Sequence, residues 1–313
     1  MLTYLLVLIA AALVLARSSV FLIDKLTAIA VKLRVSEYLV GFVIMAVATS
    51  IPELIVGILA ALENDPNLSL GNVIGSNIAN MSLILGLAAL IAGGIRVQIQ
   101  VRNREMIFTD LIGVAPLVML LDQRLSRTEG IVLLAFFFLY MYNLIFQSRE
   151  YHKVTTDHRT ERPLWRELAL FGAGLAVLVA SAQVMVSASE KLALLLGIPM
   201  ILFGIFAVAL STSLPELTTS ISAAIRRQSG FVMGNILGST VANSTLVLGI
   251  TAIIQPFTVE NPTILTVSAV MLVLTLLVLT FFVRTGYRIT RIESLVLILG
   301  YVVYLAATEL FLR

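Results

Sequence analysis

Long apolar segments alternate with short polar connections along the whole chain. A helix needs about 20 mainly apolar residues to cross a membrane, and ten segments are of roughly that length or longer. Several exceed what a straight, perpendicular span requires, which indicates tilted or broken helices. We therefore predict an all-α polytopic membrane protein with ten transmembrane helices. The predicted spans are residues 1–31, 36–62, 69–93, 105–121, 128–146, 166–193, 198–225, 231–255, 263–283 and 292–312.

One sizeable hydrophilic stretch, residues 147–165, divides the chain into two halves of five spans each. Because five is odd, the second half must enter the membrane from the side opposite to the first. Many secondary transporters are built from inverted repeats of this kind. We predict one five-helix repeat over residues 1–146, a linker over 147–165, and a second, inverted repeat over 166–313.

The distribution of Lys and Arg predicts how the chain is oriented. With both termini outside, fifteen of these residues fall in the inward loops and four on the outward side. Cytoplasmic loops of membrane proteins carry such an excess of positive charge. We therefore predict an integral protein of the cell membrane, surrounded by lipid, with both termini outside and the central linker in the cytoplasm.

Composition supports the membrane class and excludes several others. The chain has 59% hydrophobic and 12% charged residues, whereas soluble domains average about 45–50% and about 25%. There is no cysteine, which excludes disulfides, thiolate metal sites and cysteine catalysis, and both histidines lie in the linker. No H-E-x-x-H, nucleophile–base constellation or nucleotide-binding motif is present. We expect neither an enzyme nor an ATP-driven pump, and no cofactor or nucleic-acid partner.

Two sequence blocks occur once in each half. Residues 49–54 (TSIPEL) correspond to 212–217 (TSLPEL), and 71–80 (GNVIGSNIAN) correspond to 234–243 (GNILGSTVAN). Both pairs are offset by 163 residues (212 − 49 and 234 − 71). Each first block places an acid inside an apolar segment, where a charge costs at least about 2.5–3.5 kcal/mol. The repeated acids, Glu53 and Glu216, are therefore candidate functional residues.

The prolines of the first blocks predict broken helices. Pro52 and Pro215 have no N–H, so each frees a carbonyl one turn earlier, and in lipid that carbonyl needs another partner. Hydroxyls lie at the same level of the helix, so carbonyl, hydroxyl and carboxylate oxygens gather there as ligands suited to hard cations. These hydroxyls belong to Thr49, Ser50, Thr212 and Ser213. A kink with a lipid-shielded Glu would explain one such motif, but it explains two identically spaced motifs poorly.

The second blocks indicate close helix packing beside these acids. Their glycines form small-xxx-small faces that let backbones approach. Ser76 and Asn80 share one helix face, as do Ser239 and Asn243, because residues four apart are neighbours on a helix. Together the blocks predict a site of formal charge −2 that contains only oxygen and amide ligands. Ca²⁺ suits such a site better than Mg²⁺, and an empty site would hold a proton or monovalent cations.

The two pairs of blocks resemble the α-repeats of the calcium/cation antiporter superfamily, most closely its prokaryotic sodium/calcium exchanger branch. The resemblance covers all ten spans, with the α-repeats over residues 41–92 and 204–255. It implies two inverted five-helix halves, a midplane site open alternately to either side, and exchange of Ca²⁺ for Na⁺. It also implies ligands at Glu53, Glu216, Thr49, Thr212, Ser50, Ser213, Ser76, Asn80, Ser239 and the carbonyl groups of Ala46 and Ala209.

One position departs from the family pattern. Sodium/calcium exchangers often carry an acid at the place of Asn243, which is an amide here and which we include among the candidate ligands. The loss of that carboxylate leaves H⁺/Ca²⁺ exchange as an alternative. An ion channel and an intramembrane hydrolase are further alternatives, but the inverted repeat and the absence of a catalytic motif argue against them. We expect a monomer that binds Ca²⁺ and a monovalent counter-ion.

Overall fold

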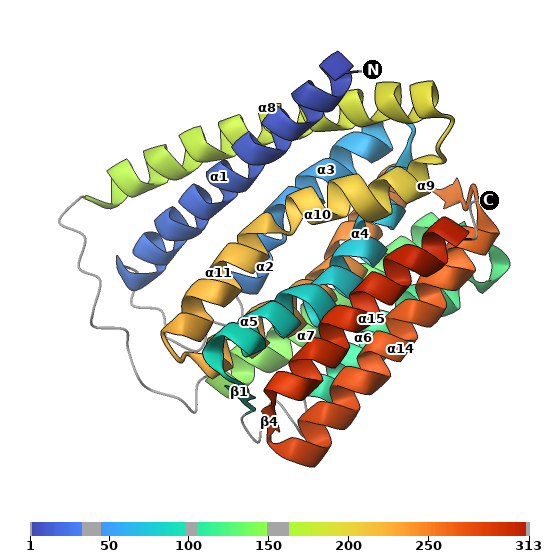
Figure 1. Cartoon of the computed structure of the whole chain (residues 1–313). Coiled ribbons are helices and arrows are strands. Elements are labelled where there is room, and N and C mark those ends of the chain that lie inside the picture. The colour runs from blue at the N-terminus through green and yellow to red at the C-terminus, as the bar shows by residue number, and fades with distance from the viewer. Residues whose placement is uncertain (1, 33–44, 98–104, 149–162, 311–313) are drawn as a thin grey trace.

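The computed structural model describes residues 2–32, 45–97, 105–148 and 163–310, and these are mostly helical (Figure 1). Before residue 149 the helices are α1 (Leu2–Lys32), α2 (Met45–Thr49), α3 (Ile51–Leu62), α4 (Pro66–Ala79), the π-helix η2 (Asn80–Ile84), α5 (Leu85–Ala92), α6 (Met106–Met119), the 3-10 helix η4 (Leu120–Asp122) and α7 (Arg127–Ser148). After residue 162 they are α8 (Leu164–Leu196), α9 (Met200–Phe203), the π-helix η5 (Gly204–Val208), α10 (Ala209–Thr212), α11 (Leu214–Ile225), α12 (Ser229–Val241), the π-helix η6 (Ala242–Val247), α13 (Leu248–Ile254), α14 (Pro262–Gly286) and α15 (Arg291–Leu310).

Each of the ten predicted spans coincides with one of these helical stretches in the part of the chain that the structure describes. By length and composition, six of them could cross a membrane, and a bent pair, Met200–Thr212 with Leu214–Ile225, makes up to seven. The remaining stretches, which include the 22-residue α7, do not pass that test among the described residues. Helix α6 has only 14 residues, and α3 is a short helix of 12. Residues 36–44 of the second predicted span lie outside the described residues.

The centre of the fold consists of two helical stretches that correspond between the halves. Pro66–Ala92 and Ser229–Ile254 have 78% and 83% of their apolar windows buried inside the protein, against 28–39% for the other spanning helices. Both contain a π-helical turn, η2 and η6, at matching places. Such turns are frequent at functional sites because they interrupt the regular hydrogen-bond ladder. The buried pair therefore forms the core around which the outer helices pack.

Two short antiparallel ladders join the halves at the loops. β1 (Ile95–Arg96) pairs with β4 (Arg288–Ile289), and β2 (Arg124–Leu125) pairs with β3 (Phe257–Thr258). Each ladder takes one strand from each side of the central linker. The backbone N–H of Val97 also donates to the carbonyl of Tyr287, and that of Val259 donates to the carbonyl of Gln123. The loops are thus tied together by the backbone itself.

Glycines bring α4 into backbone contact with α9 and η5. A Cβ atom on Gly71 would lie 2.0 Å from the carbonyl oxygen of Ile201, and one on Gly75 would lie 2.4 Å from that of Ile205. From the other side, a Cβ on Gly204 would lie 2.4 Å from the carbonyl oxygen of Leu68. The predicted close packing of the second block is therefore present at Gly71 and Gly75, and it crosses between the halves.

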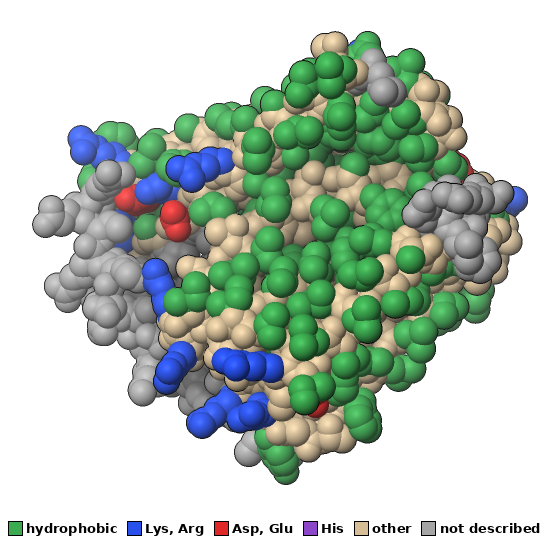
Figure 2. Space-filling view, viewed as in Figure 1, with side chains coloured by type: hydrophobic (Ala, Val, Ile, Leu, Met, Phe, Trp, Pro, Cys, Tyr) green, Lys and Arg blue, Asp and Glu red, His purple; other side chains and the backbone are tan. Residues whose placement is uncertain are grey.

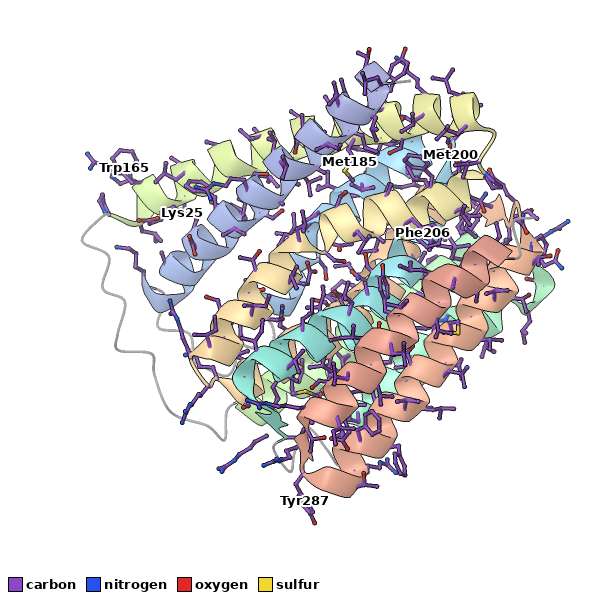
Figure 3. The ribbon with its side chains drawn as sticks, viewed as in Figure 1. Lys25, Trp165, Met185, Met200, Phe206 and Tyr287 are labelled. Atoms are coloured by element: carbon purple, nitrogen blue, oxygen red, sulfur yellow. The ribbon has the colours of Figure 1, made fainter. Side chains whose placement is uncertain are left out.

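The outer surface has the polarity expected of a membrane protein. Figure 2 shows a broad hydrophobic face, with most of the visible Lys and Arg side chains along the left side, from the ends of α1 and α8 down to β1 and β4 in Figure 1. In Figure 3, Trp165 lies at the upper left, at the start of α8, and Tyr287 lies at the bottom, beside β4; they are 64% and 59% exposed. Aromatic residues of this kind are enriched where a membrane meets water. The distribution agrees with an integral membrane protein.

A group of acids surrounds the connection between α3 and α4. Burial raises the pKa of Asp65 from 3.8 to about 6, and the nearby carboxylates of Glu260, Glu190 and Glu63 add to the effect. The loop is fixed there because Asn67 donates to the carbonyl of Thr258 at 3.2 Å. Ionisation of Asp65 is therefore less favourable in the folded protein than in the unfolded chain.

Replacing Asp65 by Asn is expected to stabilise the protein near pH 7. Because the pKa of Asp65 is higher in the folded protein, the contribution of this group to stability is fully present below pH 3.8 and is lost as the pH rises through about 6. Asn keeps the neutral form at every pH and also suits the N-cap position that Asp65 occupies. The thermal midpoint of Asp65→Asn should exceed the parent's at pH 7, with the difference vanishing below pH 4. An equal difference at both pH values would contradict this assignment.

Candidate ion-binding site

The site is built where two helices break at matching places. The chain leaves helical geometry at Ser50 (φ −82°, ψ 2°) and at Ser213 (φ −83°, ψ 4°), between α2 and α3 and between α10 and α11. Pro52 and Pro215 lie in the first turn of the helix that follows, a position that tolerates a missing N–H. The second break bends its helix pair by 42°. The break predicted from each TS-x-PEL block is therefore present in both halves.

Thr49 reaches across to the second half of the chain. Its hydroxyl oxygen lies 2.8 Å from that of Ser239, and it donates to the side-chain oxygen of Asn235 at 3.1 Å. Both partners lie on α12. The contact therefore joins the first helix break to the second GN-x-x-GS block.

Thr212 makes the corresponding contact in the opposite direction. Its hydroxyl lies 3.5 Å from that of Ser76 and donates to the side-chain oxygen of Asn72 at 3.0 Å. The residues of this group are offset by 163 from those of the first (212 − 49, 239 − 76 and 235 − 72). The same arrangement of hydroxyls and amides thus occurs twice, and each copy combines residues of both halves.

The two glutamates lie beside these contacts and have no basic partner. Glu53 and Glu216 are both 0% exposed. Ser76 donates to one carboxylate oxygen of Glu53 at 3.4 Å. Among the described residues, the second oxygen of Glu53 and both oxygens of Glu216 have no hydrogen-bond partner, and no Lys or Arg pairs with either acid. Buried carboxylates are normally paired or bound to metal ions, so these oxygens are available to a cation.

Other buried oxygens in the same region also have no hydrogen-bond partner among the residues that the structure describes. They belong to the hydroxyls of Ser50 and Ser213 and to the amides of Asn80 and Asn243. The carbonyl of Ala209 lies 3.5 Å from the hydroxyl of Ser76. Ala46, the matching residue of the first half, lies in α2. Predicted ligands that are at most 2% exposed are Thr49, Ser50, Glu53, Ser76, Asn80, Ala209, Thr212, Ser213, Glu216, Ser239 and Asn243.

The chemistry of this set favours a hard cation. Its atoms are carboxylate, hydroxyl, amide and carbonyl oxygens. Hard cations such as Ca²⁺ and Na⁺ bind oxygen ligands of this kind, whereas softer transition metals prefer sulfur or imidazole ligands. Within the described ranges there is no group of three or more His, Cys, Asp or Glu residues that could hold a metal. The candidate site therefore combines two carboxylates with many neutral oxygens.

Comparison with known proteins agrees with this geometry. Residues 3–146 and 166–308 match the family model described as sodium/calcium exchanger protein. The chain belongs to the sodium/calcium exchanger protein family. It is 31% identical to the putative antiporter CaxA of Alkalimonas amylolytica, over 89% of this chain and 90% of that protein. It is 28% identical to the sodium/calcium exchanger MaX1 of Methanosarcina acetivorans, over 93% and 94% of the two chains.

A solved exchanger has a similar fold. The structure of the sodium-calcium exchanger NCX_Mj soaked with Na⁺ and Ca²⁺ superposes with a TM-score of 0.70 at 27% identity, covering 98% of both chains. The resemblance drawn from the two repeated blocks is thereby confirmed. The family is one of membrane exchangers rather than enzymes, in agreement with the class expected from the sequence.

Sequence reasoning on this exchanger missed two amides of the site. Asn72 and Asn235 accept hydrogen bonds from the two threonines but were not among the candidate ligands. Their signal was present, since each follows the first glycine of its block and the two are 163 residues apart. Burying a polar amide in the protein costs free energy, as burying a hydroxyl does. An amide at the same place in both repeats is therefore a candidate for the site, for the same reason as the repeated hydroxyls.

Proposed function

We propose that this exchanger moves Ca²⁺ across the membrane in exchange for Na⁺, by alternating access to the site around Glu53 and Glu216. The observation that carries the proposal is a pair of fully buried carboxylates without a basic partner among the described residues. A divalent cation compensates both charges at once. The surrounding oxygens complete the six to eight ligands that Ca²⁺ takes. The names and fold of its relatives support the same ions.

The proposed topology is two inverted five-helix halves with both termini outside. Elements that match at an offset of 163 residues, such as α3 with α11 and α4 with α12, support it. An odd number of spans in each half inverts the second, so that the two helix breaks meet from opposite sides near the midplane. The gathering of Lys and Arg along one side, in Figure 2, supports a cytoplasmic assignment for that side and for the central linker.

The charge of the site bears on the counter-ion. With both glutamates ionised and Asn243 neutral, the site has a charge of −2, which one Ca²⁺ or two Na⁺ neutralises. A third Na⁺ would have to bind through neutral oxygens. Proton exchange is the second candidate, because a pair of buried carboxylates can bind a proton in place of a monovalent ion. The neutral amide at Asn243, where many exchangers have an acid, is the observation that favours it.

Ion uptake into proteoliposomes separates these candidates. Vesicles loaded with Na⁺ and diluted into Na⁺-free medium are expected to accumulate radioactive Ca²⁺, and an ionophore that collapses the Na⁺ gradient should abolish uptake. Each uncompensated charge is worth about 2.3 kcal/mol per 100 mV, so an imposed potential reports the stoichiometry. Uptake that follows a pH gradient and ignores Na⁺ would replace the sodium mechanism by the proton mechanism. Absence of uptake under both gradients would refute the antiporter.

A further inference from the structure

The two repeats differ at several buried positions next to the site, and one of these differences involves a polar side chain that contacts a predicted ligand. Asn77 of the first half corresponds to Thr240 of the second, since 240 − 77 is 163. Thr240 donates to the carbonyl of Ile236 in its own helix at 2.9 Å. Asn77 instead crosses to the other half, where its amide nitrogen donates to the hydroxyl of Ser244 at 2.8 Å. This contact has no counterpart in the other repeat, because the partner Ser244 corresponds to Met81 (244 − 163).

This same side chain also holds an amide of the proposed site. The side-chain oxygen of Asn77 accepts from the amide nitrogen of Asn243 at 3.2 Å. The oxygen of Asn243 is buried and has no partner among the described residues. Asn80 is the corresponding residue of the first half, and neither its amide nitrogen nor its amide oxygen has a hydrogen-bond partner among the described residues. Asn243 thus has a fixed nitrogen and an available oxygen, whereas Asn80 has no such constraint.

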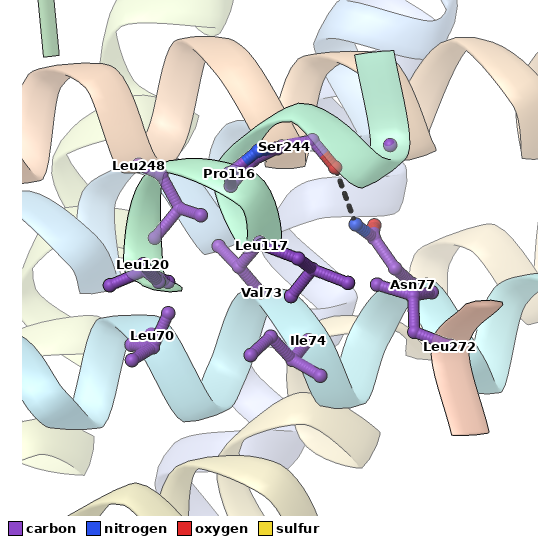
Figure 4. A pocket seen from close by; sticks show the side chains of 11 residues that line it. Leu70, Val73, Ile74, Asn77, Pro116, Leu117, Leu120, Ser244, Leu248 and Leu272 are labelled. Atoms are coloured by element: carbon purple, nitrogen blue, oxygen red, sulfur yellow. Dashed lines mark hydrogen bonds between the residues drawn. The ribbon is translucent and has the colours of Figure 1, made fainter. Parts of the chain in front are cut away.

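The surroundings of Asn77 are mostly apolar and offer its side chain few hydrogen-bond partners. Asn77 and Ser244 line a small cavity that is otherwise apolar, as Figure 4 shows, with Val73, Ile74 and Leu117 among its walls. Asn77 and Ser244 are each 1% exposed. A buried amide needs hydrogen bonds, and Ser244 is the one other polar residue of this lining. In this arrangement Ser244 accepts from the nitrogen of Asn77, and the oxygen of Asn77 accepts from the nitrogen of Asn243.

We propose that Asn77 is a positioning residue that keeps the carbonyl oxygen, rather than the nitrogen, of Asn243 available to the transported cation. The inference rests on the proposed function of the site. An amide has nearly the same shape when its oxygen and nitrogen are exchanged, but only the oxygen attracts a cation. Because the interaction of a dipole or charge with an ion grows with the ionic charge, Ca²⁺ depends on this orientation more than a monovalent ion does.

Replacing Asn77 by Thr, the residue of the other repeat, tests the proposal. The threonine hydroxyl can bond to its own helix, as that of Thr240 does, and leaves Asn243 free to turn. In proteoliposomes the half-saturating Ca²⁺ concentration should rise about tenfold, that of the monovalent ion about threefold, and the maximal rate should change less than twofold. The matched control, Thr240→Val, removes the corresponding hydroxyl and should leave both concentrations within about twofold.

Combining Asn77→Thr with a second substitution, Asn243→Asp, distinguishes a positioning role of Asn77 from a merely structural one. In Asn243→Asp the two side-chain oxygens are equivalent, so orientation no longer matters and Asn77→Thr should then change Ca²⁺ affinity less than twofold. An equal loss in both backgrounds, or no loss in either, would overturn the proposal. If Asn77→Thr fails to fold, Ser244→Ala should produce a smaller rise of the same sign. If the parent transports no Ca²⁺, the proposed function fails. The role of Asn77 can still be tested, because calorimetry measures the Ca²⁺ affinity of the purified parent and of Asn77→Thr without transport.

Discussion

Substitution of Glu53 or Glu216 by Gln is expected to lower Ca²⁺ transport by at least about a hundredfold while the protein still folds. Each variant halves the negative charge that offsets the dehydration of a divalent ion. Two unit charges about 4 Å apart interact by about 4 kcal/mol at an effective dielectric constant of 20, and Ca²⁺ carries twice that charge. A loss of even about 3 kcal/mol corresponds to roughly a hundredfold in affinity. Both residues are 0% exposed, so water cannot replace the lost carboxylate freely.

Folding should not suffer from either substitution. A buried carboxylate without a basic partner is a cost to the empty protein, and Gln removes that cost while keeping the shape. The thermal midpoint of each variant, measured without Ca²⁺, should therefore equal or exceed that of the parent. Added Ca²⁺ should raise the midpoint of the parent and not that of the variants, because a ligand stabilises only the state that binds it.

Glu129→Gln is the matched control for these two substitutions. Glu129 accepts hydrogen bonds from the backbone and hydroxyl of Ser126 at the start of α7, where Gln can serve in the same capping box. It should retain the parent's transport within about twofold. If Glu53→Gln or Glu216→Gln kept most of the Ca²⁺ flux, the two-carboxylate mechanism would be wrong.

Much of the fold could be predicted from the sequence because the physical constraint is strong. A backbone in lipid must satisfy its own hydrogen bonds, so an apolar segment of sufficient length forms a helix. The proline of each TS-x-PEL block likewise predicts its helix break, and the structure has both breaks at the preceding Ser50 and Ser213. The edges were less predictable. Helix α4 begins at Pro66, three residues before the predicted span, because polar residues of its first turn are buried against β3.

The partners within the site could not be predicted from spacing along one helix. Positions four apart share a face, but that rule does not say which residue of the other half lies opposite. The contact of Thr49 with Ser239 depends on how α2 packs against α12, and that of Asn77 with Asn243 depends on how α4 packs against η6. The three π-helical turns were also missed, since apolar periodicity does not distinguish a helix with one extra residue per turn from a regular one.

Gly71→Ala is expected to be among the most damaging small substitutions in this protein. A Cβ at this position would lie 2.0 Å from the carbonyl oxygen of Ile201, 2.9 Å from its carbonyl carbon and 3.0 Å from the nitrogen of Ile205. All three atoms belong to backbone, which cannot rotate away as a side chain can. Helix α4 must therefore separate from α9 and η5, and this displaces Asn72 and Ser76 from Thr212.

Overpacking of a core costs about 1–3 kcal/mol, and a backbone collision belongs at or above the upper end. At about 2–4 °C per kcal/mol for a protein of this size class, the thermal midpoint should fall by about 6–12 °C. Transport should fall with it, because the hydroxyl and amide pairs of the site span the same helix contact.

Gly300→Ala in α15 is the control, since a Cβ there meets no atom within 4 Å. Alanine favours a helix by about 1 kcal/mol over glycine, so Gly300→Ala should be neutral or stabilising. Equal midpoints for the two variants would show that α4 can move away from η5 without cost, contrary to the close packing described here.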